Sequence, residues 1–92
     1  MATAAIKVKI MPEGIDTDLE HLKKEIKRRV ESEIPKALSH SFEEQPIAFG
    51  LKALIALIVW PEEKETSLLE DLIKSISGVS QVDIIDYRRV VG

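Results

Sequence analysis

The stretch that decides the fold is GLKALIALIVW, residues 50–60, because its apolar pattern fits either a helix or a strand. Two observations favour a strand. Gly50 and Pro61 frame the segment, and β-branched and aromatic side chains gather at its end. We therefore predict a central strand here. Both of its faces are apolar, so we expect the face that points away from the main core to be partly covered as well.

The segments before this strand predict another strand and a helix. Residues 4–13, AAIKVKIMPE, alternate between apolar and polar side chains, which is typical of a strand with one buried face. Residues 16–35 carry apolar side chains at spacings of three and four, as one stripe of a helix does. Thr17 and Glu20 fit a capping box at its start, and Pro35 indicates its end.

The segments after the central strand repeat this order. Residues 61–78 predict a second, shorter helix, in which Ser67 and Glu70 fit another capping box. Gly78 is typical of the residue just beyond a helix C-terminus. The last segment, VSQVDIIDYRRVVG at residues 79–92, predicts a final strand.

The weakest pattern is KALSHSFEEQP, residues 36–46, in which Leu38, His40 and Phe42 alternate with smaller side chains. It predicts a short edge strand that ends at Pro46. The complete order is then β-α-β-β-α-β, with no linker and no internal repeat. This is the α+β, ferredoxin-like arrangement: two helices on one face of a four-stranded antiparallel sheet. We expect residues 1–92 to form one such domain.

Composition narrows the classes of function. The chain has 92 residues and a formal charge of -3, which argues against a nonspecific nucleic-acid binder, since those are usually basic. It has no cysteine, and its N-terminus lacks the pattern of a signal peptide, so we expect a cytoplasmic protein. The longest apolar run is far shorter than the ~20 residues of a membrane helix, so no membrane contact is expected.

Most catalytic patterns are absent from the sequence. It contains neither a glycine-rich phosphate loop nor a nucleophile elbow. The two histidines, His21 and His40, are interpreted as structural or surface residues. We therefore expect no catalytic residue, no metal site and no cofactor. The central strand has a single aromatic residue, Trp60 at its end, instead of the aromatic platform on which such sheets stack RNA bases.

Three stretches carry a resemblance to a known family: MPEGIDTDLEHLKKEI (residues 11–26), PIAFGLKALIALIVW (residues 46–60) and LLEDLIKSISGVSQVDIIDYRRV (residues 68–90). Together they resemble the archaeal elongation factor 1-beta family and the guanine-exchange domain of its eukaryotic counterparts. The resemblance implies a guanine-nucleotide exchange factor of translation. Its partner would be elongation factor 1-alpha, from which it promotes release of GDP and which then reloads with GTP. Such a factor acts non-covalently and is not an enzyme.

The resemblance also implies where the partner binds. In the family, the aromatic residue of a proline-to-glycine loop contacts the GTPase, and Phe49 occupies that position here. Pro46 and Gly50 would bracket the turn, and Lys52 follows it. The residue pattern alone allows Phe49 to be either core or surface, whereas the resemblance favours a surface anchor.

A second family contact does not transfer to this chain. Eukaryotic members have a lysine near the C-terminus that is aimed at the Mg²⁺ site of the GTPase, but this chain has no lysine after Lys74. Arg88 or Arg89 is the candidate replacement for that positive charge. Alternatively, the two arginines are solvated charges that discourage aggregation at a sheet edge.

Two alternatives come from other classes of function. The doubly apolar central strand would suit an oligomerising regulatory module that binds a small ligand between subunits, whereas an exchange factor is expected to be a monomer. Light scattering distinguishes the two. An enzyme that resembles the small acylphosphatases would need a phosphate-binding glycine loop with an asparagine, and the chain contains no asparagine.

Overall fold

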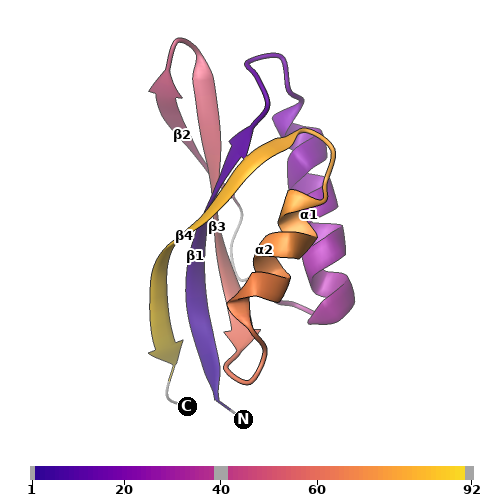
Figure 1. Ribbon diagram of the computed structural model, residues 1–92, viewed down its shortest axis with the longest axis vertical. Helices are drawn as coiled ribbons and strands as arrows, with labels where there is room; N and C mark the ends of the chain where they lie inside the picture. The colour runs from indigo at the N-terminus through magenta and orange to yellow at the C-terminus, as the bar shows by residue number, and fades with distance from the viewer. Residues whose placement is uncertain (1, 39–41, 91–92) are drawn as a thin grey trace.

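The computed structural model describes residues 2–38 and 42–90, and their elements follow the predicted β-α-β-β-α-β order (Figure 1). Their bounds are β1 (Thr3–Pro12), α1 (Leu19–Glu33), β2 (Glu43–Ala48), β3 (Leu51–Pro61), α2 (Thr66–Lys74) and β4 (Val79–Val90). The four strands form one antiparallel sheet in the order β2-β3-β1-β4. Both helices pack on the same face of this sheet (Figure 1). The predicted ferredoxin-like α+β fold is confirmed.

The core lies between the sheet and the helices. Paired residues of neighbouring strands share a face, and the pair Ile6–Ile58 at the centre of β1 and β3 is fully buried. Burying one such side chain stabilises the fold by about 1.5–3 kcal/mol. The helices contribute most of the predicted apolar stripes to this core, with these residues buried: Leu22, Ile26, Val30, Leu69 and Ile73. Ile76 is also buried, but it lies in the turn just after α2.

The second face of β3 carries the other apolar row. Ala53 on this face is buried, and Ile55, Leu57 and Val59 are partly exposed, which agrees with the expected partial cover. Lys9 of β1 pairs with Ile55, and long lysine side chains lay their aliphatic stems along such apolar rows. Both α1 and α2 lie on the opposite face of the sheet (Figure 1). The partial burial of this row therefore fits cover by side chains of the neighbouring strands.

The predicted cap of the first helix is wrong by one residue. Asp18 is the N-cap, and its Oδ1 accepts hydrogen bonds from the backbone N–H of Glu20 at 3.1 Å and of His21 at 3.2 Å. The hydroxyl of Thr17 is already engaged, because it accepts a hydrogen bond from the N–H of Gly14 at 3.1 Å. The Asp18 carboxylate also suits the positive end of the helix dipole. The helix ends before Pro35, as predicted.

Both predicted ends of the second helix are also wrong. Its N-cap is Glu65, which makes no side-chain cap bond, and Ser67 lies within the first turn, where its hydroxyl donates to Glu65 at 3.2 Å. Its C-cap is Ser75, three residues before Gly78. Gly78 instead belongs to the turn into β4, with a φ of 100°. The sequence signals were present, but local hydrogen bonding placed the ends elsewhere.

The predicted edge strand lies too early in the chain. The strand β2 runs from Glu43 to Ala48, so Pro46 is inside it, and Leu38 forms only an isolated bridge with Ile58. His40 lies outside the described residues. All six residues of β2 are exposed, so a buried-face periodicity could not mark it. Proline is tolerated because β2 is an edge strand.

Candidate functional site

The strands β2 and β3 are joined by a tight turn made of Phe49 and Gly50 alone. Both residues have positive φ, 53° for Phe49 and 82° for Gly50, as a type I′ hairpin turn requires. Glycine adopts this conformation freely. A bulky residue such as Phe49 does so only at a cost of roughly 1–3 kcal/mol. Pro46 therefore does not bracket the turn, which is tighter than expected.

The side chain of Phe49 is 100% exposed. A large aromatic ring that touches no core adds nothing to the hydrophobic stability of the fold. Exposure and backbone strain thus both oppose Phe49 at this position in the free protein. Strained residues concentrate at binding and switch sites, so this pair of observations points to contact with another molecule.

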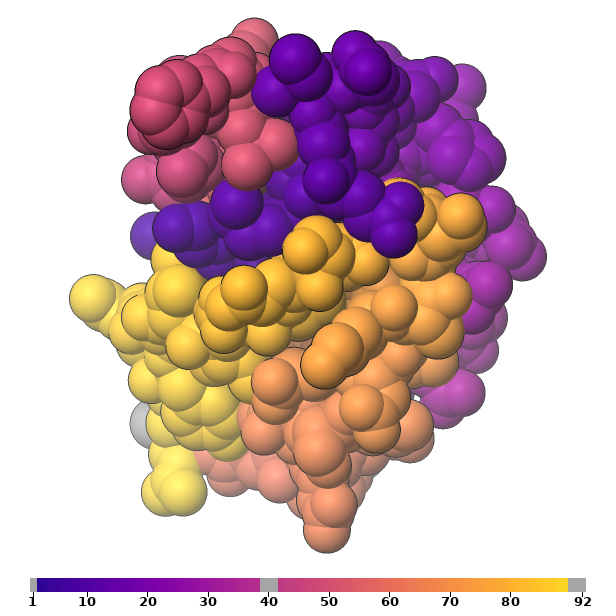
Figure 2. Space-filling model, turned by 45° about the horizontal axis from the view of Figure 1, so that its top comes forward, coloured from indigo at the N-terminus to yellow at the C-terminus, as the bar shows by residue number. Residues whose placement is uncertain are grey.

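Two further apolar residues are exposed at the same end of the molecule. Ile47 of β2 is 40% exposed, and Ile15 of the β1–α1 loop is 66% exposed. Ile15 lies beside the turn, because its Cγ2 is 3.8 Å from the position that a Cβ on Gly50 would take. Figure 2 shows the β1–α1 loop and the β2–β3 hairpin next to each other at the top of the molecule. Sequence reasoning missed Ile15, although an isolated isoleucine in the polar segment PEGIDTD was a usable signal.

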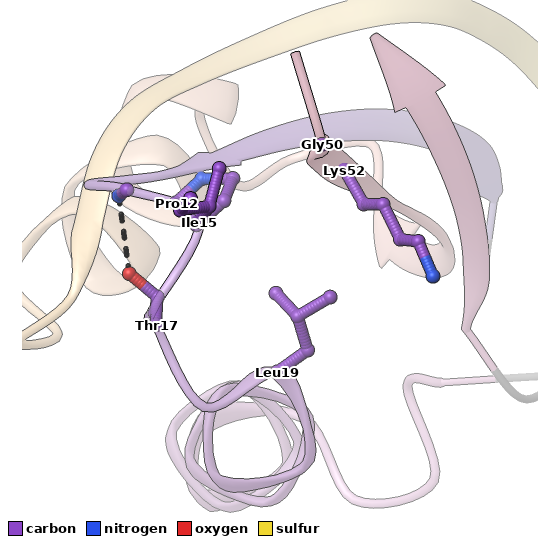
Figure 3. Close-up of a pocket in the computed structure, with 7 residues that line it drawn as sticks. Pro12, Ile15, Thr17, Leu19, Gly50 and Lys52 are labelled. Carbon is purple, nitrogen blue, oxygen red and sulfur yellow. Dashed lines mark hydrogen bonds between the residues drawn. The ribbon is translucent and has the colours of Figure 1, made fainter. Parts of the chain in front are cut away.

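A hollow of about 190 Å³ separates this loop from the hairpin (Figure 3). Its lining consists of Pro12, Gly14, Ile15, Thr17, Leu19, Gly50 and Lys52. The volume is below the roughly 300–1,000 Å³ of small-molecule sites, so the hollow does not suit a cofactor. Among residues 2–38 and 42–90, no group of three acidic or histidine side chains could hold a metal ion.

A cluster of ion pairs links the hairpin to α1. The Nζ of Lys23 lies 2.9 Å from carboxylate oxygens of both Glu20 and Glu44, and the Nζ of Lys52 lies 3.8 Å from the other oxygen of Glu44. The hydrogen bond from Lys23 lowers the pKa of Glu44, and the same bond, followed by that to Glu20, raises the pKa of Lys23. Both shifts favour the charged pair at neutral pH.

The structure does not bring the two arginines to the turn. Arg89 pairs with Ala4 in the sheet, and Ala4 pairs with Trp60, whereas the turn immediately precedes Leu51 at the opposite end of β3. The molecule measures 42 Å along its longest axis, and Figure 1 places the end of β4 and the hairpin toward opposite ends of it. Pro46, Phe49, Gly50 and Lys52 therefore lie toward one end of the molecule, and Arg88 and Arg89 lie toward the other.

Each arginine also has an acidic partner within the chain. The Nε of Arg88 lies 3.1 Å from Oδ2 of Asp86, and Arg89 forms an ion pair with Glu62. Both arginine side chains remain largely exposed. Their charge is thus partly compensated, but their guanidinium groups are accessible to another molecule.

Comparison with known proteins identifies the class of this domain. The family described as the EF-1 guanine nucleotide exchange domain matches residues 5–90. The chain is 45% identical over 91 residues to elongation factor 1-beta of Methanosarcina barkeri, which covers 98% of this chain and 100% of that protein. It is 41% identical over 93 residues to elongation factor 1-beta of Methanothermobacter thermautotrophicus, covering 99% and 100%. The chain belongs to the archaeal elongation factor 1-beta family.

This membership confirms the resemblance seen in the sequence. The chain is a translation elongation factor whose role is guanine-nucleotide exchange, and this role is supported over the ligand-binding module. Among the described residues, no helix is both long and apolar enough to cross a membrane.

Proposed function

We propose that this chain releases GDP from elongation factor 1-alpha, and that the turn at Phe49 is the anchor by which it binds that GTPase. The observation that carries the proposal is the conformation of Phe49, which is fully exposed and held at positive φ. An aromatic ring of this kind is the typical hot spot of an interface. The exposed Ile15 and Ile47 beside it widen the apolar contact.

The mechanism is coupling between two binding events. An exchange factor binds the nucleotide-free GTPase more tightly than the GDP-bound form. By reciprocity it weakens GDP binding by the same factor. No bond of the nucleotide is made or broken, so the chain needs no catalytic residue and no cofactor of its own. The factor needs a rigid scaffold and a contact that fits one state of the GTPase better than the other.

Three residues around Phe49 have supporting roles in this proposal. Pro46 stiffens the exposed edge strand because its φ is restricted, and Gly50 permits the tight turn. Lys52 is half exposed on the rim of the site, where its charge can meet an acidic group of the partner.

Arg88 and Arg89 would contact a second place on the GTPase. They lie at the other end of a molecule 42 Å long, so they would meet a part of the partner that the turn at Phe49 does not contact. In this proposal one of them replaces the C-terminal lysine of eukaryotic members and disturbs the Mg²⁺ that holds GDP. We further propose that the factor works as a monomer in the cytoplasm, where translation elongation occurs.

The test is the release of fluorescent GDP from the cognate GTPase, titrated with the factor. Truncating an anchor typically costs ~2 kcal/mol or more, so Phe49→Ala should raise the half-saturating concentration about 30-fold. The control is Leu68→Ala, which truncates another exposed apolar side chain, on α2. Circular dichroism should show both variants folded. Normal GDP release with Phe49→Ala would overturn the role of Phe49, and loss of the fold would show that Phe49 is structural.

A further inference from the structure

The strand β2 is an edge strand that few contacts hold to the rest of the domain. All six of its residues are exposed, and within the described residues it pairs with β3 alone. Yet β2 is the strand that leads into the turn at Phe49. A contact that holds this strand against the rest of the domain therefore bears on where Phe49 is presented.

The side chain of Glu44 makes such a contact. Glu44 pairs with Leu54, whose side chain lies in the core, so Glu44 is on the helix-facing side of the sheet. There its Oε2 accepts a hydrogen bond of 2.9 Å from Nζ of Lys23, on α1. Within residues 2–38 and 42–90, no other side-chain hydrogen bond or ion pair joins β2 to a helix.

We propose that Lys23 and Glu44 are positioning residues that brace the β2–β3 hairpin against α1 and so set the position of Phe49. The proposal rests on the proposed role of Phe49 as the anchor. From Glu44 to Phe49 an extended strand covers roughly 16 Å, so a small rotation at Glu44 becomes a larger displacement at the turn. A braced hairpin also loses less conformational freedom when the partner binds, which favours association.

The environment of Lys23 makes it suited to this task. Only 24% of its side chain is exposed, against 36% for Glu44, and its ammonium is held by Glu20 on the same helix as well. Glu20 therefore orients Lys23 toward the sheet before the partner binds. Both side chains still reach solvent, and an ion pair at the surface contributes little to global stability, so its removal should leave the domain folded.

The first experiment measures the free protein. Hydrogen–deuterium exchange of the backbone amides in residues 43–55 is compared between the native chain and Lys23→Met, which keeps an apolar stem but removes the ammonium. Lys23→Arg keeps the charge and should behave as the native chain. The matched control is Arg28→Met, which breaks the 2.8 Å pair with Glu25 on the same helix without touching β2. We expect faster exchange in the hairpin for Lys23→Met alone, with β1 and β4 unchanged.

The second experiment measures GDP release from the GTPase. Lys23→Met and Glu44→Gln should each raise the half-saturating concentration about two- to five-fold and leave the maximal release rate unchanged. Combined with Phe49→Ala, the same substitutions should have no further effect, because the brace acts through Phe49.

The outcomes separate the two proposals. If Phe49→Ala impairs GDP release but Lys23→Met alters neither hairpin exchange nor release, the brace is refuted and the anchor stands. If the hairpin exchanges faster in Lys23→Met while Phe49→Ala releases GDP normally, the anchor fails and the positioning role fails with it. An equal loss of activity in Arg28→Met would also refute the brace, because it would show a general effect of surface charge.

Discussion

At the scale of single residues, Phe49 is unfavourable for the stability of its own domain. Its φ of 53° is unfavourable for an aromatic residue, and its ring is fully exposed. A sequence selected for stability alone would place Asn or Gly here, since these residues favour type I′ turns. The proposed role in binding the GTPase would account for a residue that the fold itself does not favour.

This account predicts that Phe49→Asn stabilises the domain while it impairs exchange. Relief of the positive φ should raise the free energy of unfolding by about 0.5–1 kcal/mol, measured by urea denaturation. GDP release should fall as for Phe49→Ala. A Phe49→Asn variant that is less stable than the native chain would contradict the strained conformation.

The glycines give a graded prediction for alanine substitutions. At Gly50 the φ is 82° but the new Cβ meets only Ile15 at 3.8 Å, so Gly50→Ala should cost about 1 kcal/mol from the backbone conformation. Gly78→Ala should cost more, because its φ is 100° and the Cβ would lie 3.2 Å from Leu22 in the core. Gly14→Ala meets nothing within 4 Å and is the control. Urea denaturation of the three variants tests this order, and equal effects would contradict it.

At the scale of elements, the position of the β2–β3 hairpin depends on a small number of side-chain contacts. The Glu44–Lys23 bond lowers the pKa of Glu44, so this pair favours the native arrangement above the unfolded pKa of glutamate. Its contribution is lost as the pH falls through the lowered pKa of Glu44. The pKa of Lys23 is raised, so at high pH the same pair loses its contribution to stability as the pH rises through the raised pKa of Lys23.

The corresponding prediction concerns the titration of Glu44. Carboxyl carbon NMR should show a midpoint below the ordinary glutamate value of about 4.3. In Lys23→Met the midpoint should rise, because the hydrogen bond from Lys23 is the largest cause of the shift. Arg28→Met should leave Glu44 unchanged and raise instead the pKa of Glu25, which Arg28 lowers. If the titration midpoint of Glu44 were the same in the native chain and in Lys23→Met, the hydrogen bond between Lys23 and Glu44 would not be formed in solution.

At the scale of the whole molecule, the candidate contacts lie at two ends of a domain 42 Å long. The turn at Phe49 is apolar and strained, whereas Arg88 and Arg89 are charged and each has an acidic neighbour. These two ends call for different partner chemistry, an apolar pocket at one end and an anionic or metal-bound group at the other. The sheet and its core set the separation between them.

Because the ends are far apart, their effects on binding should add. The free-energy change for Phe49→Ala with Arg88→Met should equal the sum of the two single changes within about 0.5 kcal/mol. Raising the salt concentration should weaken the contribution of Arg88 but not that of Phe49. Titrations of GDP release at two salt concentrations measure both quantities, and strong coupling between the two variants would contradict separate contacts.

Much of this architecture could be predicted from local pattern. The period of two in residues 4–13 and the helical stripes through Leu22 and Leu69 marked elements that the structure confirms. The family resemblance selected Phe49, and the comparisons confirm the family. Such patterns are readable because burial of one face imposes a period on the sequence.

The parts that could not be predicted depend on contacts between distant residues. Local pattern alone marked β1, β3, β4 and both helices, since each follows from neighbours along the chain, and the family resemblance selected Phe49. Only the tertiary structure showed that β2 begins at Glu43, because an exposed strand is defined by its pairing with β3 and has no apolar period. Only the fold placed Ile15 beside Gly50, joined Lys23 to Glu44 and separated Arg88 from Phe49. The physical reason is that these relations are set by sheet register and packing between elements, which spacing along the chain does not encode.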